Sequence, residues 1–134
     1  MITYVDILNN ASDLYDKLSE NNFKTNNIEV EYRNCARMAY YSMLHLSKQL
    51  VEKNDVEIDM TDVHGTHEIT IRKLMAINSD IAAKLANNLI SCRKTRVKAD
   101  YKIEKSFTKN DAYTVLRKAE KVASEAKEML STGT

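Results

Sequence analysis

The sequence contains no proline and only two glycines, Gly65 and Gly133. These residue types most often end regular elements and form tight turns, so strands and hairpins have few positions at which to turn. No apolar run approaches the roughly 18 to 20 residues that cross a bilayer. The N-terminal MITYVDILNN also lacks the basic and apolar parts of a secretory signal. We therefore expect an all-α protein of the cytoplasm that does not enter a membrane.

Cysteine is also scarce, with Cys35 and Cys92 at positions that are apolar on the predicted helices. In a chain without an export signal, this pattern indicates two reduced, buried thiols rather than a redox or metal site. The length of 134 residues predicts one domain with a single core over residues 1–134, of which residues 132–134 form a frayed tail.

What the sequence does have is a helical period, because apolar residues recur at three- and four-residue steps. The predicted helices cover residues 3–20, 28–53 and 67–77, followed by one that begins after Ser79 and one that begins after Thr108. Side chains suited to N-terminal caps precede three of them, namely Thr3 with Asp6, Ser79, and Thr108 with Asp111. The asparagine-rich residues 21–27 are expected to form an exposed loop. The pattern predicts an all-α, antiparallel bundle of four to five helices.

The charge is small overall but unevenly distributed. A net charge of +1 excludes a globally basic nucleic-acid binder, yet residues 93–109 hold seven basic and two acidic side chains, or +5, and residues 52–68 sum to −5. Within the basic segment, Arg93 and Arg96 can neutralise phosphates and Tyr101 can stack on a base, as single-stranded RNA binding requires. The alternative interpretation is a solvated helix end, where cations suit the helix dipole.

A second polar group lies on the predicted helix over residues 28–53. Arg37, Tyr41 and His45 are spaced four residues apart, so they form one line of neighbouring side chains that begins near Arg33. Arginine can hold a phosphate, and histidine, which titrates near neutrality, can exchange a proton with a ribose hydroxyl or a leaving oxygen. The alternative is structural, with Tyr41 at the edge of the core and His45 as a hydrogen-bonded boundary residue.

Two further histidines, His64 and His67, follow Asp59 and Asp62 within nine residues. This composition suits a divalent metal, but no standard zinc spacing matches it. We favour a solvated acidic loop whose histidines begin the next helix, and we predict no metal and no cofactor.

Three segments together resemble the HEPN superfamily: RMAYYSMLHLSKQL at residues 37–50, HGTHEITIRKLM at 64–75, and RKTRVKADY at 93–101. The resemblance covers about residues 32–130 and is to the small stand-alone HEPN proteins often encoded beside a minimal nucleotidyltransferase. It implies an antiparallel bundle of four or five helices that forms a homodimer with a cleft at its two-fold axis. It also implies a partner protein, either that nucleotidyltransferase or an antitoxin, and RNA as a ligand.

Active members of this superfamily are metal-independent endoribonucleases that serve as toxins or phage-defence effectors. They use an arginine followed after about four to six residues by a histidine, and the ribose 2′-hydroxyl attacks the adjacent phosphorus. Carried to this sequence, that motif would fall on Arg93 or Arg96 and the segment ending at Tyr101. Ala99 and Asp100 occupy the place of the histidine, so the usual motif is missing.

Three functions remain open. The best fit is a non-catalytic HEPN module of a toxin–antitoxin or phage-defence system that binds RNA, nucleotide or a partner protein through a polar cleft. The second is a ribonuclease toxin with a substitute site, in which Arg93 and Arg96 grip phosphate and His45 carries the proton. In both, the substrate-binding candidates are Arg37, Tyr41, Lys98, Asp100 and Tyr101. The third is a purely structural helical adaptor, which predicts that these polar side chains are scattered.

Overall fold

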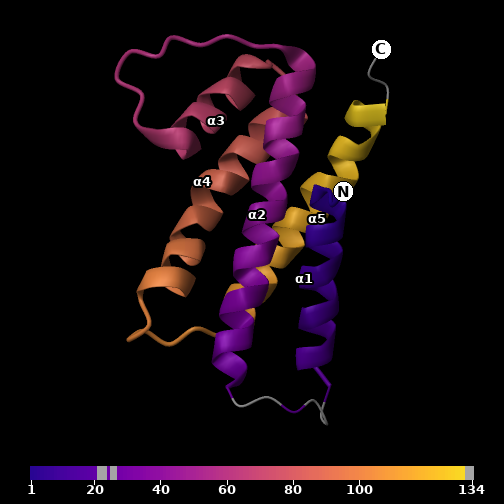
Figure 1. Ribbon diagram of the computed structural model, residues 1–134, viewed down its shortest axis with the longest axis vertical. Helices are drawn as coiled ribbons and strands as arrows, with labels where there is room; N and C mark the ends of the chain where they lie inside the picture. Colours follow the sequence, from indigo (N-terminus) through magenta and orange to yellow (C-terminus); the bar gives the residue numbers. More distant parts are fainter. Residues whose placement is uncertain (21–23, 25–26, 132–134) are drawn as a thin grey trace.

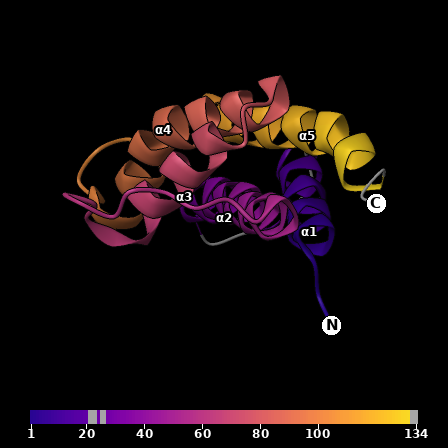
Figure 2. The same cartoon turned by 90° about the horizontal axis from the view of Figure 1, so that it is seen from above.

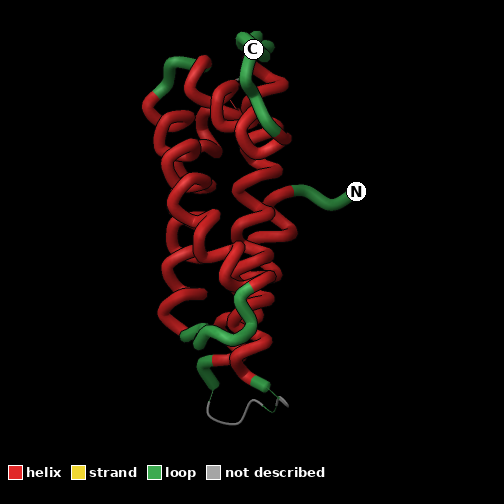
Figure 3. The backbone as a smooth tube through the Cα atoms, turned by 90° about the vertical axis from the view of Figure 1, so that its left-hand side faces the viewer, coloured by secondary structure: helices red, strands yellow, loops and turns green. Residues whose placement is uncertain are grey.

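The described part of the chain folds into five helices (Figure 1). The computed structural model describes residues 1–20, 24 and 27–131, and within these ranges it contains helices and connecting loops but no strand (Figure 3). The helices are α1 (Tyr4–Leu18), α2 (Ile28–Asn54), α3 (Gly65–Ala76), α4 (Asp80–Tyr101) and α5 (Lys109–Ser131). The predicted all-α bundle is confirmed. The largest difference at a predicted helix start is at α3, which begins at Gly65, a residue with a φ of +84° that favours glycine.

The predicted caps begin three of these helices. At α1 the carboxylate of Asp6 accepts a hydrogen bond from the Thr3 backbone N–H at 2.8 Å. At α4 the hydroxyl of Ser79 accepts from a backbone N–H three residues later, at 3.4 Å. At α5 the pairing is reciprocal, since Thr108 N–H donates to Asp111 at 2.9 Å and Asp111 N–H donates to the Thr108 hydroxyl at 3.1 Å. Each cap satisfies backbone donors that the first turn of a helix leaves unpaired.

Most of the loop predicted over residues 21–27 lies outside the described residues. Of the two that are described, Lys24 is exposed and Asn27 caps α2, because its side-chain oxygen accepts from the Val30 backbone N–H at 3.3 Å.

Four helices form two layers, with α1 and α2 in one layer and α4 and α5 in the other (Figure 2). These four alternate in direction along the chain, and the short α3 packs against α4 and α2 (Figure 1). The longest helix, α2, contacts every other helix and supplies the middle of the core. Cys35 and Cys92 are buried free thiols, and burial raises the pKa of Cys35 to about 12. No helix in the described ranges is long and apolar enough to span a membrane.

The C-terminal end of α4 is held to α2 by a buried arginine. Arg33 is only 5% exposed. Its guanidinium donates hydrogen bonds of 2.5 to 3.2 Å to the backbone oxygens of Lys98, Ala99, Lys102 and Lys105. The oxygens of Lys98 and Lys102 also accept backbone N–H groups, whereas for those of Ala99 and Lys105 no other donor is found among the described residues. Arg33 thereby fixes the basic end of α4 against α2.

Candidate functional site

Arg96 of α4 lies among three tyrosines. Its guanidinium carbon is 5.9 Å from the ring centre of Tyr40, 5.8 Å from that of Tyr41 and 5.9 Å from that of Tyr101. These are cation–π distances, and Nη2 also donates to the Tyr41 hydroxyl at 3.2 Å. The guanidinium is therefore held in one orientation by residues of α2 and α4.

Asp100 pairs with two arginines at the same place. Its carboxylate binds the Nε atom of Arg37 across the α2–α4 contact, and its Oδ2 lies 3.0 Å from Nε of Arg96. The second contact is an ion pair without the angle of a hydrogen bond, and Nε of Arg96 is otherwise buried without a partner. Arg37 is further held by the side chain of Asn34, which accepts from Nη1 at 2.6 Å. Asp100 thus joins α2 to α4 and neutralises one of the two guanidinium charges.

A histidine from α3 completes this group. Nδ1 of His67 lies 2.6 Å from the hydroxyl of Tyr40, and the two rings are stacked with centres 6.1 Å apart. Burial raises the pKa of Tyr40 to about 12, so its hydroxyl is neutral. Burial, and then the charges of Arg93 and Arg96, lower the pKa of His67. The imidazole is therefore neutral at pH 7.

Arg93 is the exposed cation of the group. No hydrogen bond or ion pair of its side chain is found among the described residues, although its charge acts on both Tyr40 and His67. An unpaired guanidinium next to a fixed one is the arrangement that binds phosphate oxygens. We call this group the Arg–Tyr cluster; it comprises Arg37, Tyr40, Tyr41, His67, Arg93, Arg96, Asp100 and Tyr101.

Most of the site residues predicted from the sequence lie in this cluster, but Lys98 does not. Its Nζ atom is 3.1 Å from Asp111 and 5.7 Å from the ring centre of Phe107, so it faces the start of α5. The reason is helical geometry, since positions two residues apart lie about 200° apart around the helix axis. Lys98 therefore cannot share the face of Arg96 and Asp100.

His45 also lies apart from the cluster. It is exposed and lines a hollow of about 400 Å³ with Gln49, Glu52 and residues of the N-terminal end, Met1, Ile2, Thr3, Tyr4 and Ile7. Each four-residue step on a helix turns about 40° beyond a full turn, so the line from Arg33 to His45 rotates by roughly 120°. Within one chain, the structure does not bring His45 together with Arg93 and Arg96.

His67 and Tyr40 are the cluster residues that the sequence did not identify as partners of the arginines, and Tyr40 was assigned to the apolar face of its helix. The signal in the sequence for His67 was its place in the HGTHEITIRKLM segment, but the acids that precede it in the chain suggested a metal site instead. The sequence neighbours Asp59 and Asp62 make no ion pair with His67 among the described residues, and Asp59 accepts instead from the Thr61 backbone N–H at 2.8 Å. His64 is separate from His67 and exposed, and its backbone N–H donates to Glu68 at 3.0 Å.

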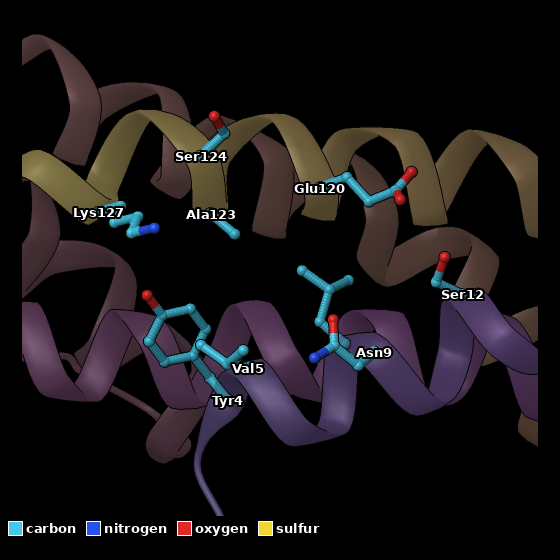
Figure 4. A pocket seen from close by; sticks show the side chains of 9 residues that line it. Tyr4, Val5, Asn9, Ser12, Glu120, Ala123, Ser124 and Lys127 are labelled. Atoms are coloured by element: carbon cyan, nitrogen blue, oxygen red, sulfur yellow. The ribbon is translucent and has the colours of Figure 1, made fainter.

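A groove of about 510 Å³ runs between α1 and α5 (Figure 4). Its lining residues are Tyr4, Val5, Leu8, Asn9 and Ser12 from α1, and Glu120, Ala123, Ser124 and Lys127 from α5. It holds one acid, one base and no histidine or cysteine, and in Figure 1 it lies on the opposite side of α2 from α3. The Arg–Tyr cluster is therefore the better candidate for a functional site, although the groove is the larger concave surface.

A protein-family model described as "HEPN domain" matches residues 4–129. The chain belongs to the HEPN domain family. No curated protein matches the sequence. In this HEPN domain, of Ala99 and Asp100, the two residues expected at the place of the motif histidine, Asp100 has its carboxylate engaged with Arg37 and Arg96, and Ala99 is buried.

Proposed function

We propose that this HEPN domain binds the phosphate groups of RNA or of a nucleotide at the Arg–Tyr cluster, as a non-catalytic module of a cytoplasmic toxin–antitoxin or phage-defence system. The observation that carries this proposal is the guanidinium of Arg96, fixed among three tyrosine rings beside the unpaired Arg93. A cation that is already oriented loses little conformational entropy when it binds a phosphate. Tyr101, which is 69% exposed, offers a ring on which a base can stack.

The charge of the cluster supports an anionic ligand. Three guanidinium groups and one carboxylate leave +2, from Arg37, Arg93, Arg96 and Asp100. The surrounding residues 93–109 carry +5, so the field of the cluster extends along the end of α4. Such a local surplus attracts a polyanion even though the net charge of the chain is only +1.

The same geometry counts against a structural adaptor and against a substitute nuclease site that uses His45. A structural adaptor predicts scattered polar residues, whereas Arg37, Tyr41, Arg96 and Tyr101 lie together. The substitute site predicted from the sequence needs His45 beside Arg93 and Arg96, whereas within one chain His45 lines a separate hollow.

RNA binding tests the proposal directly. We expect a fluorescently labelled single-stranded RNA to bind the purified protein in EDTA, as measured by fluorescence anisotropy. Arg93→Gln should weaken binding by roughly tenfold, because a phosphate contact contributes about 1 kcal/mol or more. Arg96→Lys keeps the charge but removes the planar guanidinium, which can donate two hydrogen bonds to one phosphate and can stack on the tyrosine rings. It should therefore also weaken binding.

Arg117→Gln is the matched control, because Arg117 is an exposed arginine of α5 that pairs with Glu120. It changes the net charge by the same amount and should leave RNA affinity close to that of the wild type. Wild-type affinity in both cluster variants, with their folds verified by circular dichroism, rules out the proposed site.

A second candidate, a metal-independent endoribonuclease with a substitute site, is favoured by the position of His67. In this reaction His67 takes the proton of the ribose 2′-hydroxyl, the 2′-oxygen bonds to phosphorus, and the P–O5′ bond breaks. The products are a 2′,3′-cyclic phosphate and a 5′-hydroxyl whose oxygen takes its proton from water. Arg93 and Arg96 stabilise the charge on the phosphoryl oxygens.

The two candidates differ in the fate of the RNA. The nuclease predicts cleavage that survives EDTA and is lost in His67→Gln but not in His45→Gln. RNA that is bound and recovered intact identifies the module as a binder.

We further propose that the protein forms a homodimer through α4 and acts with a nucleotidyltransferase or antitoxin partner. Ile90, Val97 and Tyr101 share one face of α4 by their spacing, and Ile90 is 50% exposed. Apolar side chains exposed beside a polar site are typical of a protein contact. Light scattering after size exclusion should give twice the monomer mass for the wild type and a monomer for Ile90→Asp.

A further inference from the structure

His67 has one ring nitrogen engaged and one available. Nδ1 meets the hydroxyl of Tyr40 at 2.6 Å. Nε2 has no hydrogen-bond partner among the described residues, and it is not one of their fully buried unpaired nitrogens, so it keeps contact with solvent. A ligand that reaches the cluster can therefore hydrogen-bond to Nε2.

The charges that face this imidazole disfavour its protonated form. From α4, Arg93 and Arg96 repel a third positive charge, and burial acts in the same direction, so the pKa of His67 is lowered. His67 is also the third residue of α3, where the free N–H groups of the first helical turn carry partial positive charge.

Asp100 offsets part of the charge of Arg96, but among the described residues no acid pairs with Arg93 or with His67 itself. From α2 the facing group is Tyr40, a neutral phenol at physiological pH. On its own helix the neighbouring Glu68 is engaged elsewhere, since its carboxylate accepts from the His64 N–H at 3.0 Å and pairs with Arg72 at 3.0 Å. The imidazole thus lies in a group whose remaining charge is positive, and no anion contacts it.

From this geometry we propose that His67 is a phosphate-binding residue which takes up one proton when a phosphate group binds beside Arg93 and Arg96. This inference rests on the proposed phosphate site. The bound phosphate offsets the repulsion from the two guanidinium groups, so the imidazolium becomes the favoured form. A solvent proton adds to the ring, after which Nδ1–H donates to the Tyr40 oxygen and Nε2–H donates to a phosphate oxygen. Phosphate affinity therefore increases as the pH falls.

Isothermal titration calorimetry measures this proton directly. A short RNA with a 5′-phosphate, and the same RNA with a 5′-hydroxyl, are titrated into the protein at pH 7 in phosphate-free buffers of different ionisation enthalpy. The dependence of the observed heat on buffer enthalpy gives the number of protons taken up. For the wild type we expect uptake of up to one proton, and affinity that rises between pH 8 and pH 6 by up to about tenfold for each unit by which the pH falls.

Two variants assign the proton to this residue. His67→Gln keeps a side-chain N–H donor but cannot titrate, so binding should persist with less proton uptake and a weaker pH dependence than in the wild type. His45→Gln, a histidine outside the cluster, should behave as the wild type. A terminal phosphate has its own pKa near 6, so the difference between wild type and His67→Gln, rather than the raw uptake, is the quantity to compare.

The two RNAs separate the sources of the phosphate. A His67-dependent proton seen only with the 5′-phosphate identifies a terminal phosphate as the ligand, and one seen with both RNAs identifies an internal phosphodiester. Equal proton uptake in wild type and His67→Gln, with binding still lost in Arg93→Gln, overturns this inference and leaves the proposed function intact. Absence of RNA binding in the wild type overturns both.

Discussion

Arg33 and Arg37 are one turn apart on α2, yet they do different things. Arg33 is buried and donates only to backbone oxygens at the end of α4, whereas Arg37 reaches the carboxylate of Asp100 in the cluster. Sequence spacing placed both in one line and gave no reason to separate them. The difference arises because the line rotates around the helix, so that neighbours four residues apart meet different parts of α4.

Replacing Arg33 with methionine should destabilise the fold strongly. Methionine fills the space of the stem but removes the guanidinium donors to the carbonyl oxygens of Ala99 and Lys105. An unsatisfied buried acceptor costs about 1 to 3 kcal/mol, and four hydrogen bonds are lost in all, so we expect a loss of about 3 kcal/mol or more. Urea unfolding followed by circular dichroism measures it. Arg117→Met, at an exposed arginine of α5, should change the unfolding free energy by less than about 0.5 kcal/mol. A small effect of Arg33→Met would show that the carbonyls find water instead.

At the scale of the helices, most of the fold was predictable from local sequence. The caps at Thr3, Ser79 and Thr108 act through contacts within three residues, so their effect does not depend on the tertiary structure. The apolar period then fixed which face of each helix is buried. The start of α3 was less predictable, because Gly65, a residue that usually ends helices, begins this one.

The cap of α5 gives a pH-dependent prediction. Burial tends to raise the pKa of Asp111, but the backbone N–H of Thr108 and the ammonium group of Lys98 outweigh it, so the pKa lies below its usual value. A lowered pKa in the folded state adds stability above the pKa of the unfolded chain, near 4, and this stability is lost as the pH falls through the folded value.

We therefore expect Asp111→Asn to lower the unfolding free energy by about 1 kcal/mol at pH 7 and by progressively less below pH 4. Urea titrations at several pH values measure the difference from the wild type. Asp13→Asn, at an exposed position of α1, is the control and should show little effect at any pH. A difference that stays constant down to pH 2 would mean that the charge of Asp111 plays no part.

At the scale of the whole molecule, the site depended on contacts that the sequence pattern does not encode. His67 reaches Tyr40 only because the connection over residues 55–64 returns the chain to the side of α4. The path of such a connection follows from packing rather than from a local period, so the sequence could not choose between His45 and His67. The positive charge of residues 93–109, by contrast, could be predicted from the sequence, because it depends only on which residues the segment contains.

The uneven charge predicts how RNA binding responds to salt. Two guanidinium contacts to a single strand, from Arg93 and Arg96, should give a slope of about −1.4 when the logarithm of the binding constant is plotted against that of the salt concentration. Arg93→Gln should reduce the magnitude of the slope by about 0.7, and Arg117→Gln should leave it unchanged. Anisotropy titrations from low to moderate salt measure both. A slope near zero would exclude phosphate contacts as the source of affinity.

The length and central position of α2 restrict how this molecule can change in evolution. One residue inserted near Tyr41 would turn everything beyond it by about 100° about the helix axis. Every later side chain of α2 would then face the wrong neighbour, since this helix touches all the others. Insertions and deletions should therefore be confined to the connections that flank α2, such as residues 55–64, and the spacing between Arg33 and Leu50 should stay constant among relatives that keep this fold.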